Sequence, residues 1–153
     1  MGRAVSLPER VADCLEQALG ESVRNVRIFE HSLFARLHIR AVATTRRRRI
    51  YLRGSGADFF ANPWLMLHEY CHVLKQWEPG ALTTPRYLAE CLRRGYWNNR
   101  FEIEAREFAD AQLPRVVSAL RATRASAEQR LTMVQTAGDK DEGGAESERY
   151  TDG

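Results

Sequence analysis

The segment 63–77, PWLMLHEYCHVLKQW, constrains the fold more than any other part of the chain. Asn62 before it is a good helix N-cap, and Pro63 is favoured at the first helical position. Apolar residues surround almost the whole of the predicted helix, so we expect it to be buried at the centre of the molecule. Three titratable side chains nevertheless lie within it, and buried polar groups need partners.

These side chains are His68, Glu69 and His72, in the order HEYCH. Positions i and i+4 of a helix lie on the same face, so both imidazoles can bind one metal ion. Glu69 is rotated by about 100° from His68, which suits a general base beside a metal-bound water. Two zinc ligands and a base on one helix are what the HExxH motif supplies. The alternative is three polar core residues, but an unpaired buried Glu69 would cost several kcal/mol.

A catalytic zinc ion needs a third protein ligand, and no histidine follows His72. The predicted helix 98–111 offers carboxylates instead. Its inward face contains Phe101, Ala105, Phe108 and Ala109. Glu102 borders this face next to the small alanines, which allow two helices to approach closely, so Glu102 is the expected third ligand. Glu104 is the rival, although we expect Glu104 and Glu107 to lie on the solvated surface.

The rest of the chain predicts one α+β domain at residues 1–135. We expect helices at 8–19, 31–39, 86–94, 98–111 and 114–135, and strands at 23–29 and 44–52. The expected architecture is a short mixed or antiparallel sheet packed on the central HExxH helix, with a helical C-terminal half. Residues 136–153 are charged and rich in glycine, so we expect a disordered tail.

Charge gives only weak guidance about partners. The formal net charge is +3, and four arginines gather at Arg46–Arg49 in the expected strand 44–52. This run is compatible with a solvated edge strand, with a preference for acidic peptides, or with phosphate contacts to nucleic acid.

The cysteines and the apolar segments indicate in which cellular compartment we expect the protein. The three cysteines, Cys14, Cys71 and Cys91, show no metal-binding or disulfide spacing and indicate reduced thiols. Cys71 is adjacent to His72, but its side chain is rotated by about 100° from that of His72 on the helix, so we interpret it as a core residue. We find no secretory signal and no segment long enough to span a bilayer, so we expect a cytoplasmic protein without membrane contact. Export without an N-terminal signal is compatible with this sequence.

HEYCH followed by FEIEAREFA resembles the gluzincins, which are zincin metallopeptidases with a glutamate as third zinc ligand. In that family the first glutamate of an E-x-x-A pattern is the ligand, and the resemblance maps it onto Glu102. Many members have Asp after this Ala, where the present sequence has Arg106. Segment 7–77 is also similar, in the order and spacing of its elements, to an uncharacterised bacterial family of presumed metallopeptidases. Its members occur in polymorphic-toxin proteins and alongside contractile injection systems.

The resemblance implies a zincin fold and hydrolysis of protein or peptide substrates, with Zn²⁺ on His68, His72 and Glu102. In zincins the strand before the active helix lines the cleft, a position that the strand with Arg46–Arg49 would take. Zincins also stabilise the oxyanion with a Tyr, His or Arg, for which Tyr87, Tyr96 and Arg86 are the candidates. The alternative function is an inactive zinc-bound module that contacts nucleic acid through Arg46–Arg49.

Overall fold

The computed structural model describes residues 2–33 and 43–141. In these residues four strands form one sheet of order β1-β2-β4-β3: β1 (Arg3–Val5), β2 (Arg27–Glu30), β3 (Ala43–Arg46) and β4 (Arg49–Leu52). The central pair β2–β4 is parallel, whereas β1–β2 and β3–β4 are antiparallel. The expected α+β class with a short mixed sheet is confirmed.

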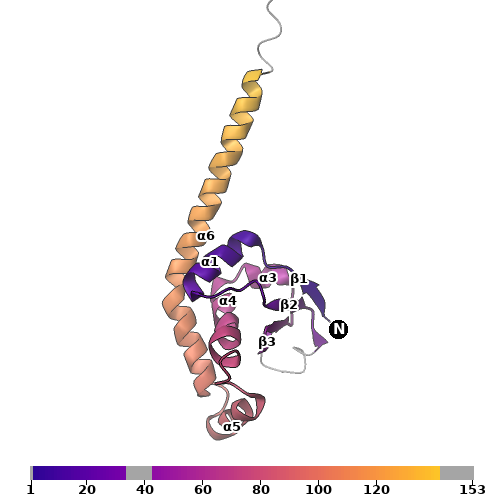
Figure 1. Ribbon diagram of the computed structural model, residues 1–153, viewed down its shortest axis with the longest axis vertical. Coiled ribbons are helices and arrows are strands. Elements are labelled where there is room, and N and C mark those ends of the chain that lie inside the picture. The colour runs from indigo at the N-terminus through magenta and orange to yellow at the C-terminus, as the bar shows by residue number, and fades with distance from the viewer. Residues whose placement is uncertain (1, 34–42, 142–153) are drawn as a thin grey trace, which may run out of the picture.

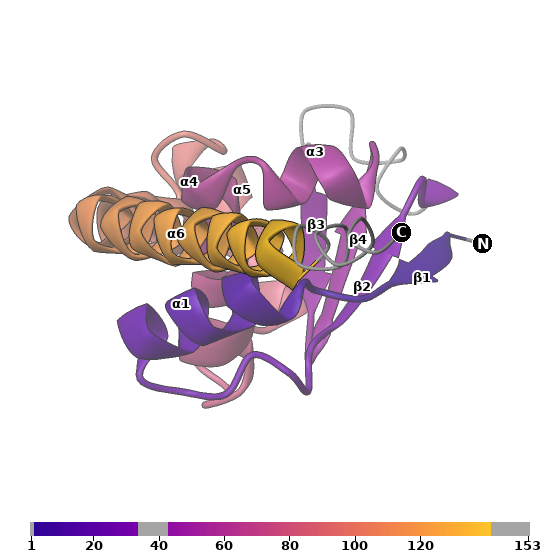
Figure 2. The ribbon, with the colours of Figure 1, turned by 90° about the horizontal axis from the view of Figure 1, so that it is seen from above.

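The helical elements of the described residues are α1 (Glu9–Leu19), α3 (Gly56–Phe60), α4 (Pro63–Tyr70), the π-helix η1 (Cys71–Trp77), α5 (Thr84–Arg94) and α6 (Arg100–Asp141). Figure 2 shows α1, α4 and α6 on one side of the sheet. The helix α6 runs along one side of the globular part and then projects far beyond it (Figure 1). No helix among residues 2–33 and 43–141 is long and apolar enough to cross a membrane.

The core lies between the sheet and these helices. Leu15 of α1, Ile28 of β2, Ile50 of β4 and Met66 of α4 are at most 1% exposed and belong to one apolar cluster. The expectation that the HExxH helix lies at the centre is therefore confirmed.

That helix begins as its local signals predict. The Asn62 side chain accepts a hydrogen bond from the Leu65 backbone N–H, and Pro63 occupies the first turn. From Cys71 onward the helix widens to a π-helix, with the Glu78 N–H donating to the Val73 carbonyl five residues earlier at 3.0 Å. The helix ends near Trp77, as predicted.

The predicted single strand 44–52 is wrong. Residues 43–52 form a hairpin, in which Arg47 and Arg48 make the turn and Thr45 pairs with Ile50. Arg48 has a φ of 54°, which only a few per cent of non-glycine residues adopt. A turn keeps Arg46–Arg49 exposed, whereas a straight strand would direct alternate arginines toward the core.

The predicted break at Pro114 is also wrong, because α6 continues through it. Proline costs one helical hydrogen bond. However, Ala109 and Val116 on either side are both fully buried, and a continuous helix keeps both in the same core. The helix extends to Asp141, beyond the predicted domain end at 135. Residues 142–153 of the predicted tail, and most of the predicted helix 31–39, lie outside the described residues.

Candidate metal centre

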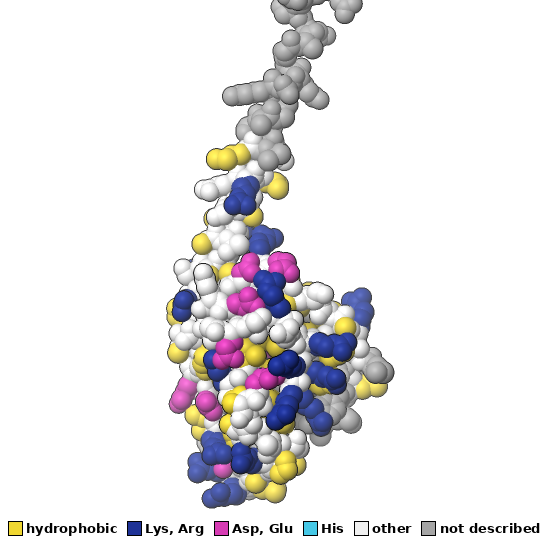
Figure 3. All heavy atoms as spheres, in the orientation of Figure 1, with side chains coloured by type: hydrophobic (Ala, Val, Ile, Leu, Met, Phe, Trp, Pro, Cys, Tyr) yellow, Lys and Arg dark blue, Asp and Glu magenta, His cyan; other side chains and the backbone are white. Residues whose placement is uncertain are grey.

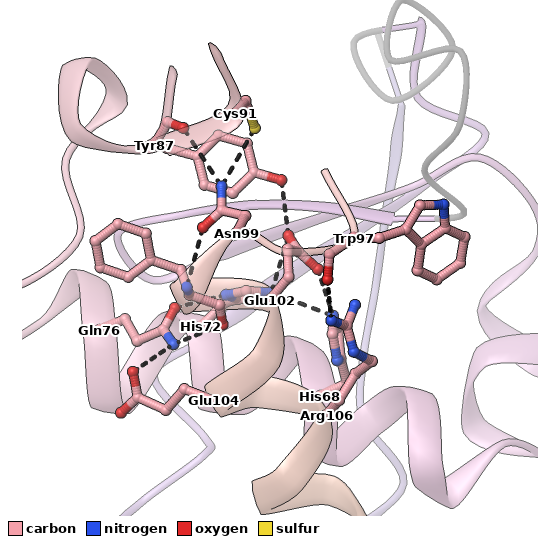
Figure 4. A network of polar contacts seen from close by, with 11 residues as sticks. His68, His72, Gln76, Tyr87, Cys91, Trp97, Asn99, Glu102, Glu104 and Arg106 are labelled. Atoms are coloured by element: carbon pink, nitrogen blue, oxygen red, sulfur yellow. Dashed lines mark hydrogen bonds and ion pairs between the residues drawn. The ribbon is translucent and has the colours of Figure 1, made fainter. Parts of the chain in front are cut away.

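Three buried side chains from separate helical elements meet at one point. His68 comes from α4, His72 from η1 and Glu102 from the first turn of α6. Figure 4 shows the Glu102 carboxylate directed at both imidazoles. The two Nε2 atoms lie 3.2 Å apart, with Glu102 Oε2 at 3.4 Å from His68 Nε2 and Glu102 Oε1 at 3.6 Å from His72 Nε2. The structure therefore places two nitrogens and a carboxylate around a common centre.

These separations fit a metal ion. Zinc bound tetrahedrally at about 2.0–2.1 Å holds its ligand atoms about 3.3 Å apart. Apart from its 3.4 Å approach to His68 Nε2, the buried Oε2 of Glu102 has no hydrogen-bond partner among the described residues. A buried carboxylate oxygen without a well-formed hydrogen bond is costly. A cation among the three side chains would satisfy this oxygen and both imidazole nitrogens. The cluster His68, His72 and Glu102 can hold a metal ion.

Small residues bring the ligand helices together. Ala105 and Ala109 of α6 are fully buried, and Phe101 is 3% exposed, as the predicted inward face requires. Phe108 is partly buried against the same core. The backbone of α6 can therefore lie close to α4, which brings Glu102 within reach of the histidines.

Contacts from α5 and from Asn99, just before α6, hold Glu102 in place. The Tyr87 hydroxyl of α5 donates to Glu102 Oε1 at 2.7 Å. The buried Asn99 accepts a hydrogen bond from the Phe101 N–H at the start of α6 and donates to the Tyr87 carbonyl and to the Cys91 sulfur. These contacts hold the first turn of α6 against α5 (Figure 4).

The two histidines are held differently. His72 Nδ1 lies 2.7 Å from the side-chain oxygen of the fully buried Gln76. His68 stacks on Trp64 with ring centroids 5.2 Å apart, and the Trp64 indole N–H donates to Asp110 of α6 at 2.7 Å. The buried His68 Nδ1 has no hydrogen-bond partner among the described residues. His68 is therefore positioned by packing, and His72 by a hydrogen bond.

The charges in the cluster stabilise one another. Burial alone would raise the pKa of Glu102, but the two imidazoles and the Tyr87 hydroxyl outweigh it and lower this pKa. Burial would lower the pKa of His72, but Glu102 and Glu69 outweigh it and raise this pKa. The metal-free cluster thus favours a carboxylate beside a positively charged imidazole.

Glu69 is 5% exposed and next to the cluster, but it is not one of the three converging residues. Burial raises its pKa, and the neighbouring His72 and His68 oppose this rise. Glu69 is therefore a buried carboxyl group next to the cluster that is not one of its three members.

The other candidate residues have different positions. Glu104 is exposed and accepts a hydrogen bond from the Gln76 side chain at 3.0 Å, so it does not join the cluster. Arg86 donates to the carbonyls of Gly80 and Ala81 in the loop before α5. Burial and the neighbouring Glu102 carboxylate raise the pKa of Tyr96.

Cys71 and the arginine run lie outside the cluster. Cys71 is 1% exposed, and burial raises its thiol pKa to about 12, which agrees with a core residue. The hairpin arginines are all exposed, and Arg48 pairs with Glu78 after η1 at 2.9 Å.

The sequence pattern did not predict the residues that hold the site in place, which are Gln76, Asn99 and Trp64. One signal was present for Gln76, since an amide in a fully apolar helix needs buried partners. Its distance of four positions from His72 also places it on the same helical face.

Fold and site together define an α+β protein with a buried His-His-Glu cluster able to hold a metal ion. Residues 6–80 match the family model described as the eCIS core domain, where eCIS stands for extracellular contractile injection system. This match includes His68, Glu69 and His72 but ends before Glu102. No curated protein and no solved structure matches the chain.

Proposed function

We propose that the protein is a zinc-dependent metallopeptidase of the gluzincin type. His68, His72 and Glu102 would hold Zn²⁺, and Glu69 would act as general base. The observation that carries the proposal is the convergence of these three ligand side chains at separations of 3.2–3.6 Å, near those of a zinc tetrahedron. The buried carboxyl group of Glu69 beside them supports hydrolysis rather than a purely structural metal.

His68, His72 and Glu102 would hold the metal as the three protein ligands that catalytic zinc sites use. Zinc, when bound, lowers the pKa of a coordinated water and polarises the carbonyl of the peptide bond. Glu69 would act as the general base that takes a proton from the attacking water and then gives it to the leaving amine. The ligand residues are 4–7% exposed, and exclusion of bulk water strengthens every charge interaction among them.

The oxyanion of the reaction needs a separate donor. The Tyr87 hydroxyl is bound to Glu102, and the Arg86 guanidinium is bound to loop carbonyls. Tyr96 also lies beside Glu102, so we propose that one of these two tyrosines supplies the donor.

The proposal is tested by measuring zinc content and proteolysis in the wild-type protein and in the variants Glu69→Gln and Glu102→Ala. We expect the wild-type protein to bind one zinc ion and to hydrolyse an unfolded protein such as casein. Glu69→Gln should keep the zinc and lose about 100-fold or more of the activity, because the base is removed and the ligands remain. Glu102→Ala should lose the zinc, since two ligands bind far more weakly than three. A wild-type protein without zinc, or an unchanged rate in Glu69→Gln, would contradict the proposal.

The competing proposal is a zinc-bound binding module that contacts nucleic acid. Its supporting observation is the hairpin with Arg46–Arg49 exposed, and Figure 3 shows Lys and Arg side chains gathered over the side that carries the sheet. Each phosphate contact makes binding weaker as salt rises. Zinc without proteolysis, together with salt-sensitive DNA binding that Arg47→Ala weakens, would favour this module over the peptidase.

The match of residues 6–80 supports a further part of the proposal. We propose that the peptidase works together with an extracellular contractile injection system. The protein or peptide substrate would then be encountered in that setting.

A further inference from the structure

Gln76 is a fully buried amide whose polar atoms all have partners. Its Oε1 lies 2.7 Å from His72 Nδ1. Its Nε2 donates to the Phe101 carbonyl at 2.9 Å and to the Glu104 carboxylate at 3.0 Å. Figure 4 shows this side chain between His72 and Glu104.

These partners fix the orientation of the amide. The Phe101 backbone carbonyl can only accept a hydrogen bond, so the group that faces it must be the NH₂ of Gln76. The carbonyl oxygen of the amide must then face His72. A flipped amide would place its oxygen against two other acceptors, the Phe101 carbonyl and the Glu104 carboxylate.

The orientation of Gln76 in turn fixes the proton of His72. An amide oxygen accepts and cannot donate, so His72 Nδ1 must carry the hydrogen. In the neutral ring the lone pair is then on Nε2, the atom that faces His68 and Glu102. A metal ion binds only a nitrogen with a free lone pair.

We infer that Gln76 is a positioning residue of the metal centre, which holds His72 in the tautomer that binds metal through Nε2. The inference rests on the proposed function. Gln76 also joins the two ligand-bearing elements, since it lies on η1 and bonds to the first turn of α6 beside Glu102. His68 has no such partner on Nδ1 among the described residues, so its proton is not fixed in this way.

Two substitutions separate positioning from packing. Gln76→Leu removes the acceptor for His72 Nδ1–H, and we expect zinc affinity to fall 10–100-fold. Gln76→Glu keeps an acceptor for His72, so zinc affinity should stay within a few-fold of the wild type. The same carboxylate would face the Phe101 carbonyl and Glu104, so zinc-free Gln76→Glu should unfold at a lower temperature than zinc-free Gln76→Leu. Competition with a chelator gives the affinities, and thermal unfolding gives the stabilities.

If Gln76 positions His72, Gln76→Leu should have the lower zinc affinity and Gln76→Glu the lower stability. If Gln76 only packs, Gln76→Glu should have both the lower zinc affinity and the lower stability. The inference is overturned if Gln76→Leu binds zinc as the wild type does, or if Gln76→Glu loses as much affinity as Gln76→Leu. The matched control is Glu104→Gln, which still offers an acceptor to Gln76 and should change zinc affinity less than about twofold.

A measurement on the wild-type protein decides the question if a variant fails to fold. In ¹⁵N-labelled zinc-free protein at alkaline pH, where the ring is neutral, NMR should show the His72 proton on Nδ1. A proton on Nε2 would overturn the inference. This result does not depend on zinc, so failure of the proposed peptidase function and failure of the Gln76 role are distinguished.

Discussion

At the scale of single residues, Tyr87 shows how one hydroxyl group ties α5 to the metal centre. Its hydrogen bond to Glu102 Oε1, 2.7 Å long, ends on a carboxylate that also faces both imidazoles. A hydrogen bond to a charged group is worth about 1.5–3 kcal/mol. The orientation of Glu102 therefore depends on a residue from another helix.

Tyr87→Phe keeps the ring and removes this bond. We expect zinc affinity to fall about tenfold, because Glu102 loses its orienting donor. Competition with a chelator measures the change. Tyr70→Phe is the matched control, because the buried Tyr70 hydroxyl has no hydrogen-bond partner among the described residues. Equal affinities in the two variants would show that the Tyr87 hydroxyl does not orient the ligand.

The three residues of the cluster could be predicted from the sequence, but the residues that support them could not. His68, Glu69 and His72 lie within one helical turn or so, and Glu102 follows from the pattern of small residues on its own helix. The partners of Gln76 in α6 lie 25 and 28 positions away in the chain. Contacts at such separations are created by helix packing and leave no local pattern.

At the scale of elements, local sequence signals predict where a helix begins. Elements whose local cost is offset by packing against distant residues cannot be predicted in this way. Asn62-Pro63 begins α4 as expected, because the cap and the fixed proline angle act on neighbouring residues alone. The strand β1 is only three residues long, and its formation depends on pairing with β2. The helix α3 begins at the Ser55 cap, whose side chain accepts from the Asp58 N–H.

Pro114 is the clearest case of an element-scale cost that packing offsets. It is exposed in the middle of α6, so its ring contributes little to the core. Pro114→Ala restores a helical N–H, worth up to about 3 kcal/mol. The freer unfolded chain of the variant subtracts about 0.4–1 kcal/mol. We expect a net gain of about 1–2 kcal/mol in the free energy of unfolding, measured by urea denaturation.

The neighbouring Arg115→Ala provides the control for this prediction. Arg115 is also exposed on α6, and its change should stay within about 0.5 kcal/mol of the wild type. A loss of stability in Pro114→Ala would contradict this prediction.

At the scale of the whole molecule, Glu30 joins three elements that are distant in sequence. It lies on β2 and is 3% exposed. It accepts hydrogen bonds from the Gly56 N–H at the start of α3 and from Arg3 of β1, both at 2.7 Å. Gly56 suits this contact, because a Cβ there would lie 3.0 Å from Val5. The sheet edge and α3 thus share one buried carboxylate.

This network predicts a specific loss of stability in acid. The Gly56 hydrogen bond and then Arg3 lower the pKa of Glu30 below its ordinary value of 4.5, although burial opposes them. A lowered folded-state pKa gives stability that is complete above the unfolded pKa and is lost as pH falls through the folded pKa. Glu30→Gln should therefore be less stable than the wild type at neutral pH, and the difference should shrink in acid.

Urea midpoints measured from neutral pH down to about pH 3 test this convergence. Glu128→Gln is the control, because Glu128 is exposed on α6 and pairs only with Arg124 among the described residues. It should follow the wild-type curve at every pH. A constant difference between wild type and Glu30→Gln across this range would exclude the proposed linkage.

The sequence by itself determined the central helix, its cap, the α+β class and the ligand types of the site. These follow from interactions between residues a few positions apart, which the chain carries wherever it folds. The tertiary structure alone decided that α6 continues through Pro114, that the arginine run turns into a hairpin, and that Gln76 meets α6. Each of these exchanges a local cost for burial or hydrogen bonding with distant residues, and that balance exists only once the helices and the sheet have packed.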